Sequence, residues 1–225
     1  DSPDFNYPLI KKLRKENFDN KVIQIVAPSV WAWRKYRAKK FAKIFDELLI
    51  LFDFEKKYFV KYGLKTTFIG HPVYYISRQK TNSQIILNNI AFLPGSRDSE
   101  LKKLLPYFYL GYKYLLDYNP KLTIFIPTLP HIKKTIDNYV KNWKMKVVVI
   151  DDVNTIEEYY QFTQKALVCS GTASLEIAKR NIPQIIIYKL NFFTEIILKL
   201  FVKIKFANII NICENEEIIP EITNS

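Results

Sequence analysis

Two glycine-bearing segments of this 225-residue chain have the residue types of a phosphate-binding turn. The first, Leu93-Pro94-Gly95-Ser96-Arg97, stands between an apolar run and a helical pattern. Glycine lets a ligand approach the backbone, a helix N-terminus offers free N–H groups, and Arg97 can grip phosphate oxygens with two parallel bonds. The segment is neither a GxxxxGK[ST] nor a GxGxxG motif. Because strand-to-helix turns often hold Gly and Ser for conformational reasons, this segment alone is weakly specific.

The second segment, Ser170-Gly171-Thr172-Ala173-Ser174-Leu175-Glu176, has the same strand–turn–helix context. We expect its N–H groups to face a diphosphate, and Glu176 to accept the two hydroxyls of a ribose. The alternative is an ordinary capped helix with an acidic residue in its first turn, which the helix dipole also favours. Two such turns in one domain favour a nucleotide site.

Other reactive side chains give weaker signals. Asp1 and Asp4 precede a helix and could serve as general base or helix cap, and chemistry alone favours capping. His71, in Gly70-His71-Pro72, is typical of a structural turn. Cys169 and Cys213 have no evident catalytic partner, and two cysteines with two histidines argue against a disulfide framework or a histidine-based metal site and for a reducing compartment.

The elements that must position these residues follow from the hydrophobic pattern. Apolar strands alternate with helical segments, which predicts an α/β fold with parallel sheets. We expect a first domain at 1–75, a polar linker at 76–89, a doubly wound second domain at 90–205 and a final segment at 206–225. Strands are expected at 21–26, 47–52, 66–69, 90–93, 122–126, 147–150, 166–169 and 184–188, and helices at about 34–45, 54–62, 99–117, 131–143, 155–162 and 174–180.

The segment 192–204 has an apolar face and a charged face at helical spacing. The apolar face includes Phe192, Phe193, Ile196 and Leu200, and the charged face includes Lys199 and Lys203. Periodicity favours an ordinary helix packed on the sheet, and the alternative is a helix on a membrane surface. No apolar run of about 18 residues occurs, so no transmembrane helix is expected.

The chain is basic, with 34 Lys and Arg against 22 Asp and Glu, a net charge of +12. Residues 1–80 carry 17 basic and 8 acidic side chains, a net of +9. This asymmetry fits an anionic partner, namely nucleic acid, a phosphorylated metabolite or an acidic membrane. The alternative is an AT-rich genome, which favours Lys, Ile, Asn and Tyr.

Several motifs together, in this order, resemble the bacterial lipid-A-disaccharide synthase family over essentially the whole chain. The run Pro28-Ser29-Val30-Trp31-Ala32-Trp33-Arg34 is highly specific, and the other motifs add order and spacing. Those motifs are Asp1–Asn6, Phe68–Pro72, Leu93–Arg97, Ser170–Ala173 and Leu175-Glu176.

The resemblance implies a GT-B inverting glycosyltransferase with two Rossmann-like domains, the first incomplete here and on the acceptor side. Family members transfer 2,3-diacylglucosamine from its UDP derivative to 2,3-diacylglucosamine 1-phosphate (lipid X), giving the β-1,6-linked lipid A disaccharide 1-phosphate and UDP. They use no catalytic metal, and no cofactor is implied. The implied location is cytoplasmic, peripheral on the inner face of the inner membrane.

The resemblance also implies roles for individual residues. Asp1 is expected to be the base that activates the acceptor hydroxyl, with Asp4 more structural, and Arg97 is expected to stabilise the departing UDP. Glu176 is the expected ribose contact and Asn211 a donor-site residue. The UDP-sugar-binding set is completed by Gly95, Ser96, Ser170, Gly171, Thr172 and Ala173. Acylated substrates raise the expectation that 192–204 and the basic segment 34–43 face a membrane.

The sequence also departs from the family pattern. The glycine-rich N-terminal strand-turn and the C-terminal helices of the family are absent, Lys189 replaces an arginine, and 212–217 diverges. We therefore expect this chain alone to bind UDP weakly if at all and to be inactive without the missing parts, with an N-terminal fragment as a candidate partner. Two other functions stay open: another GT-B nucleotide-sugar transferase, or a noncatalytic basic module that binds nucleic acid or anionic membrane.

Overall fold

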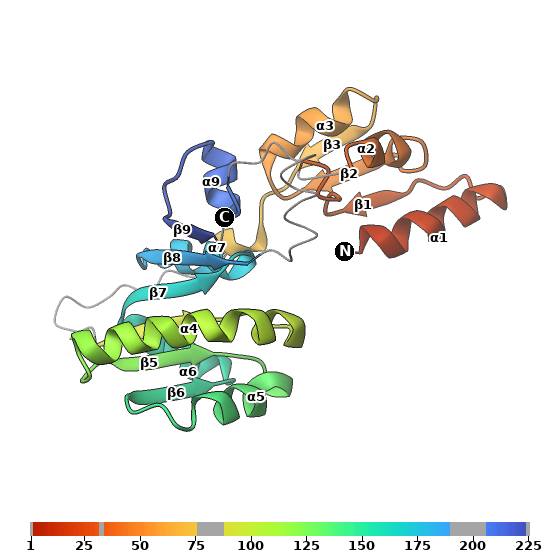
Figure 1. Ribbon diagram of the computed structural model, residues 1–225. Helices are drawn as coiled ribbons and strands as arrows, with labels where there is room; N and C mark the ends of the chain where they lie inside the picture. Colours follow the sequence, from red (N-terminus) through yellow and green to blue (C-terminus); the bar gives the residue numbers. More distant parts are fainter. Residues whose placement is uncertain (1, 32–33, 76–87, 190–205, 224–225) are drawn as a thin grey trace. The chain divides into compact units, whose positions relative to one another are not determined.

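The computed structural model describes residues 2–31, 34–75, 88–189 and 206–223. These residues fall into two compact units (Figure 1). The first contains the described residues up to Tyr74, and the second begins at Tyr75 and includes the C-terminal segment 206–223. Of the predicted linker, only residues 88 and 89 are described, and Asn89 already opens a strand.

The first unit is a three-stranded parallel sheet in the order β1-β2-β3. Its strands are β1 (Ile23–Ile25), β2 (Glu47–Ile50) and β3 (Lys65–Phe68). Its helices are α1 (Pro3–Lys15), α2 (Tyr36–Phe41), α3 (Lys56–Val60) and the 3-10 turns η1 (Asp53–Glu55) and η2 (Pro72–Tyr75), of which the last residue belongs to the second unit. The core includes Phe41, Leu48 and Phe59, all fully buried. The predicted β-α-β-α-β order is confirmed.

One predicted helix is shorter than expected. The basic helix expected at about 34–45 spans only Tyr36–Phe41. The Ile44 amide bonds to the Phe41 carbonyl, three residues back, which tightens and ends the helix. Phe45 is then drawn into the core, where it is 5% exposed. The amides of Lys43 and Ile44 thus bond three residues back, a 3-10 pattern, where the α-helix was predicted to continue.

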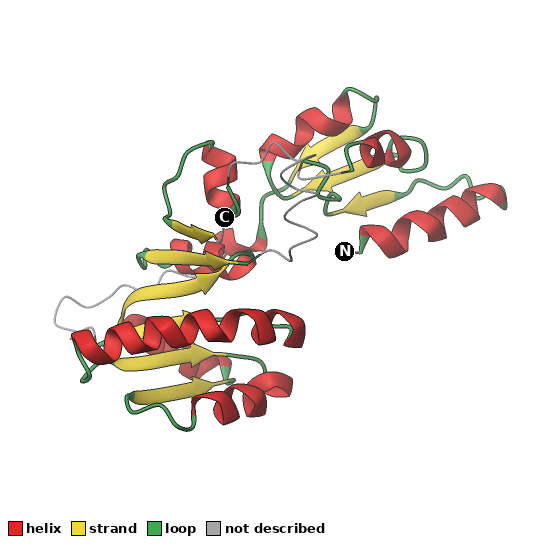
Figure 2. Cartoon of the chain, in the orientation of Figure 1, coloured by secondary structure: helices red, strands yellow, loops and turns green. Residues whose placement is uncertain are grey.

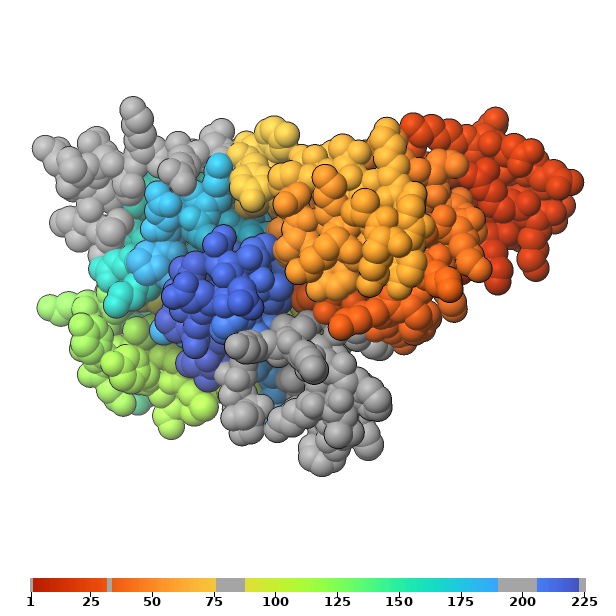
Figure 3. Space-filling view, turned by 90° about the horizontal axis from the view of Figure 1, so that it is seen from above, coloured from red at the N-terminus to blue at the C-terminus, as the bar shows by residue number. Residues whose placement is uncertain are grey.

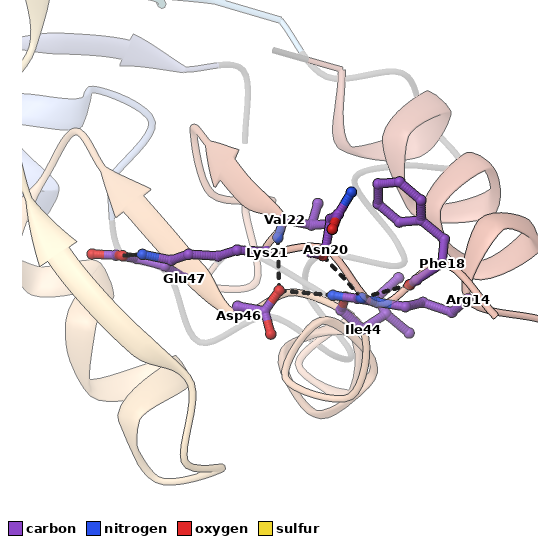
Figure 4. A network of polar contacts seen from close by, with 8 residues as sticks. All are labelled: Arg14, Phe18, Asn20, Lys21, Val22, Ile44, Asp46 and Glu47. Carbon is purple, nitrogen blue, oxygen red and sulfur yellow. Dashed lines mark hydrogen bonds and ion pairs between the residues drawn. The ribbon is translucent and has the colours of Figure 1, made fainter.

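Arg14, in the last turn of α1, joins three segments of the first unit (Figure 4). Its Nη2 atom lies 2.7 Å from Oδ2 of Asp46, and the same oxygen accepts the Val22 amide at 2.7 Å. The guanidinium also donates to the backbone carbonyls of Phe18, Asn20 and Ile44. Beside it, Lys21 pairs with Glu47 at 3.0 Å. One arginine thus holds α1 to the residues that lead into β1 and β2.

The second unit is a six-stranded, wholly parallel sheet in the order β6-β5-β4-β7-β8-β9. Its strands are β4 (Asn89–Leu93), β5 (Thr123–Pro127), β6 (Lys146–Ile150), β7 (Thr163–Cys169), β8 (Gln184–Tyr188) and β9 (Glu221–Thr223). Its helices are α4 (Asp98–Tyr118), α5 (Pro130–Val140), α6 (Val153–Gln161), α7 (Thr172–Lys179) and α9 (Ile209–Glu214).

Helices cover both faces of this sheet (Figure 2). Successive residues of β4 point to opposite faces of the sheet. Phe92 packs in the hydrophobic cluster that includes residues of α4 and α5, and Leu93 packs in the cluster that includes residues of α6 and α7. The unit is therefore doubly wound, as predicted.

The C-terminal segment adds two elements that the hydrophobic pattern did not predict, α9 and β9. β9 pairs with β8, with Ile187 opposite Ile222. In Figure 3 the surface of 206–223 (blue) lies against that of β8 (light blue). We call residues 206–223 the return segment.

Candidate functional site

The strand order of the second unit reverses between β4 and β7. From β4 the chain builds the sheet through β5 to β6, then returns to β7 on the other side of β4. These two strands are paired in parallel, with Leu93 opposite Val168. In doubly wound sheets, ligands bind beyond the carboxyl ends of the strands at such a reversal. The two glycine-bearing turns found in the sequence follow these two strands, and the fold places them side by side.

The β4–α4 turn holds Gly95 in a conformation that favours glycine, with φ +112°. A Cβ atom there would lie 2.8 Å from Oε2 of Glu100 and 3.7 Å from Sγ of Cys169, the last residue of β7. Glu100 also pairs with Arg97, whose Nη1 lies 2.8 Å from Oε1 and whose side chain is 77% exposed. Arg97, for which phosphate binding stays a prediction, therefore lies exposed at this turn and is paired with a carboxylate. Ser96 is exposed.

The β7–α7 turn is open at its centre. Gly171 has φ +141°, and a Cβ atom there would contact nothing within 4 Å among the described residues. Gly171 is also the N-cap of α7. Because glycine has no side chain, the first N–H groups of the helix have no side-chain cap. Ser170 donates its hydroxyl to the Ala207 carbonyl at 2.6 Å. Thr172 is exposed and Ala173 half-buried at the helix start.

Glu176 lies one helical turn beyond Thr172 and is half-buried. Desolvation raises the pKa of its carboxyl, an effect that the positive charge of Arg180 opposes. Arg180 itself pairs with Glu157 and lies over the ring of Tyr160, 4.6 Å from the ring centroid. The carboxyl of Glu176 thus has no direct ion pair among the described residues, which suits a group that accepts ligand hydroxyls.

Asn211 is fully buried, and its amide is fully used inside the second unit. Its Nδ2 donates to the Ile219 carbonyl at 2.7 Å and to Glu221 at 2.8 Å. Its Oδ1 accepts the amides of Ile218 and Ile219, each at 2.9 Å. The four bonds use the whole capacity of a carboxamide. This geometry gives Asn211 a structural role, and its predicted contact with the donor stays a prediction.

Some predicted residues cannot be placed. Asp1 and the segment 192–204, with Phe192, Phe193, Ile196, Lys199, Leu200 and Lys203, lie outside the described residues. Asp4 is described: it stands in the first turn of α1 and pairs with Arg37 at 2.6 Å. Asp4 therefore lies inside the helix and not before it, and the predicted cap is wrong for Asp4 because Ser2 is the N-cap.

The first unit gathers a second cluster that pattern reasoning missed. Its residues follow all three strands: Trp31 after β1, Phe52 and Glu55 after β2, and His71 after β3. His71 stacks on Phe52 at 5.6 Å between centroids, and its Nδ1 accepts the Val73 amide. Glu55 is 4% exposed and hydrogen-bonded by Trp31. Trp31 thus reaches the carboxylate of Glu55, and His71 joins the cluster through the ring of Phe52.

Burial dominates the electrostatics of this cluster. Desolvation raises the pKa of Glu55 to about 7, although hydrogen bonds from the Phe52 and Leu51 amides and from Trp31 oppose the shift. Desolvation also lowers the pKa of His71. The signal that could have revealed Glu55 was the alternation of aromatic and acidic residues in Phe52-Asp53-Phe54-Glu55, directly after an apolar strand, which in the sequence looks like an exposed first turn of a helix.

Helix length bears on membrane association. In the parts of the chain that the structure describes, no helix combines the length and apolar character needed to cross a bilayer.

The fold places the chain in a class. The second unit is a doubly wound parallel sheet with two anion-suited turns at its strand reversal, and the first is a smaller parallel α/β unit. The crystal structure of TarM is similar to this chain, with a TM-score of 0.56 at 11% sequence identity, covering 95% of this chain and 42% of that one. A TarM mutant solved with fondaparinux, alpha-GlcNAc-glycerol and UDP gives a TM-score of 0.51 at 8% identity, covering 78% of this chain and 39% of that one. This is the GT-B glycosyltransferase fold.

Sequence comparison identifies the family. The family model described as lipid-A-disaccharide synthetase (LpxB) matches residues 1–225, and the chain belongs to this family. Lipid-A-disaccharide synthase of Rhodospirillum centenum is 33% identical over 99% of this chain and 58% of its own length. The synthase of Rickettsia bellii is 35% identical over 98% of this chain and 60% of its own length. The chain thus spans about three fifths of these relatives.

Proposed function

We propose that the second unit binds the UDP moiety of a nucleotide sugar with the turns that follow β4 and β7, within a glycosyltransferase of lipid A synthesis. The observation that carries this proposal is the pairing of β4 with β7 at the strand reversal, which brings both turns to one edge. Helix N-termini and an arginine attract a diphosphate, because both offer N–H donors and positive charge. Family membership supplies the reaction class.

The chemistry proposed is direct displacement at the anomeric carbon of a UDP-linked 2,3-diacylglucosamine by a hydroxyl of 2,3-diacylglucosamine 1-phosphate. The C–O bond to UDP breaks as the new glycosidic bond forms, and the acceptor proton passes to a base, for which we propose Asp1. Negative charge grows on the departing UDP. Arg97 and the N-termini of α4 and α7 stabilise that charge, and Glu176 holds the ribose.

The binding step can be tested on this chain. We expect UDP to shift the amide resonances of 93–98 and 170–176 in the nuclear magnetic resonance spectrum and to leave those of α5 unchanged. Uridine alone probes the ribose contact, and inorganic pyrophosphate alone probes the anion contact. The substitution Arg97→Ala should weaken pyrophosphate about tenfold and leave uridine unchanged, and Glu176→Gln should do the reverse.

Lys121→Ala, which removes an exposed lysine away from both turns, is the control for general charge loss. Shifts confined to other parts of the chain would contradict the proposed site. Salt-sensitive RNA binding without any response to UDP would support the basic-module alternative instead.

We further propose that the protein works peripherally at a membrane surface, since both proposed substrates are acylated. Helix α2 supports this: Lys39, Lys40 and Tyr36 are exposed on it, and Lys40 Nζ lies 4.8 Å from the Tyr36 ring centroid. Lysines and interfacial tyrosines suit anionic headgroups. Sedimentation with phosphatidylglycerol vesicles tests this, and binding that is equal for the variant with both lysines replaced by glutamine would refute a role for α2.

A further inference from the structure

The return segment is fastened to the β7–α7 turn through one carboxylate that has no assigned role. Glu221 opens β9, the edge strand beside β8. Its Oε2 accepts the Ala207 amide at 2.7 Å, and its Oε1 accepts the Asn208 amide at 2.9 Å. Oε1 also accepts Nδ2 of Asn211 at 2.8 Å. Three neutral N–H donors therefore converge on this carboxylate, and hydrogen bonds to a charged acceptor are the stronger kind.

Ala207 and Asn208, whose amides bond to Glu221, each make one hydrogen bond to the β7–α7 turn. One bond lies before Gly171 in the sequence and the other after it. The Ala207 carbonyl accepts the Ser170 hydroxyl at 2.6 Å. The Asn208 side chain donates to Oγ of Ser174 at 2.6 Å, and both of these residues are fully buried. The order of contacts is thus Glu221, then 207–208, then the two serines that flank the glycine.

The turn has little else to hold its shape at the centre. Gly171 has φ +141°, and no described atom lies within 4 Å of the position a Cβ would take. Packing at the glycine therefore does not select its conformation. What restrains the turn is its two ends, and both ends are hydrogen-bonded to the return segment.

We propose that Glu221 is a positioning residue: through Ala207 and Asn208 it holds the β7–α7 turn in the conformation that binds the diphosphate. The identity of the ligand rests on the proposed function. The link itself, from Glu221 through 207–208 to the β7–α7 turn, does not. A glutamine at 221 offers one acceptor oxygen and an NH2 group, so at least one amide of the 207–208 pair would face a donor instead of an acceptor.

The test is amide hydrogen exchange on the full chain, comparing Glu221→Gln with Glu217→Gln. Glu217 is the matched control because it is exposed on the same segment and accepts only the Glu221 amide, at 3.2 Å, among the bonds found. We expect Glu221→Gln to speed exchange at least tenfold at 207–208 and at 174–176, where the first hydrogen-bonded amides of α7 lie, and to leave β4 and β5 unchanged. Glu217→Gln should leave 174–176 protected.

A second variant separates the link from the fold. Ser174→Ala removes the contact between Asn208 and the turn, so it should speed exchange at 174–176 while 207–208 stay protected by Glu221. Faster exchange at 206–223 alone, or equal acceleration throughout the sheet, would overturn the inference. UDP affinity provides the ligand readout: we expect about a tenfold loss in Glu221→Gln. If UDP binds the wild-type chain without shifting the amides of 93–98 and 170–176, the proposed function fails while the exchange results still decide the link.

Discussion

Glu100 touches both functional features of the β4–α4 turn: its Oε1 lies 2.8 Å from Nη1 of Arg97, and its Oε2 lies 2.8 Å from where a Cβ on Gly95 would be. One carboxylate therefore occupies the space above the glycine and neutralises the arginine. At the proposed site, a diphosphate would compete with this carboxylate for Arg97. Two predictions follow from this relationship.

Replacing Gly95 with alanine should destabilise the second unit. The new methyl would meet Glu100 at 2.8 and 3.2 Å, and φ +112° is itself strained for an L-residue. Gly171→Ala is the matched control, since it has the strain of a positive φ without a contact. We expect Gly95→Ala to lower the free energy of unfolding in urea by about 2–3 kcal/mol. The loss in Gly171→Ala should be smaller by about 1 kcal/mol. Equal losses would show that Glu100 simply moves aside.

Replacing Glu100 with glutamine should strengthen anion binding. Removing the carboxylate frees the guanidinium of Arg97, but the pair is largely exposed, so the gain is modest. We expect pyrophosphate affinity to rise about two- to fivefold by titration calorimetry. Asp98→Asn removes the same charge from the same helical turn, and no bond joins Asp98 to Arg97 among those found. An equal gain in Asp98→Asn would show that the effect comes from the change in net charge and not from the release of Arg97.

The stability of the first unit should depend on the ionisation of Glu55. Its pKa is about 7 in the folded state and near 4.5 in the unfolded chain, because burial favours the neutral acid. The stabilisation by proton binding is complete below about pH 4.5 and is lost as pH rises through 7. Relative to Glu55→Gln, the wild type should therefore lose about 3 kcal/mol of unfolding free energy between pH 4.5 and 8.

His71 has the opposite effect, since burial lowers its pKa and its protonation therefore opposes folding. Both chains in the comparison contain His71, so its contribution cancels in their difference. A difference that stays constant with pH would show that Glu55 is ionised throughout.

Arg14 should stabilise the first unit through the several hydrogen bonds that its guanidinium group donates at once, and not through its charge alone. Its side chain donates to Asp46 and to three backbone carbonyls, and only 23% of it is exposed. Arg14→Lys keeps the charge but cannot make these bonds together, so we expect a loss of about 2 kcal/mol in chemical unfolding. Arg37→Lys, which disturbs a pair with the exposed Asp4, should cost less than about 1 kcal/mol. Similar losses in both variants would contradict this prediction.

Most of the architecture could be predicted from local pattern, and the exceptions have physical reasons. The central strands were found because residues such as Phe92 and Ile124 stand in short apolar runs. β9 escaped prediction because it has three residues, begins with Glu221 and lies at an edge. The helix near Lys35 was predicted too long because helical periodicity does not show where Phe45 turns into the core.

The sequence by itself determined the fold class, the family and the two turns, because hydrophobic period and glycine placement are local properties of the chain. Only the tertiary structure decided that β7 pairs with β4, that Ser170 bonds to Ala207, and that Glu221 reaches Asn208. These contacts join residues from separate elements. Their formation depends on strand order and packing, which the spacing of residues along the chain does not specify.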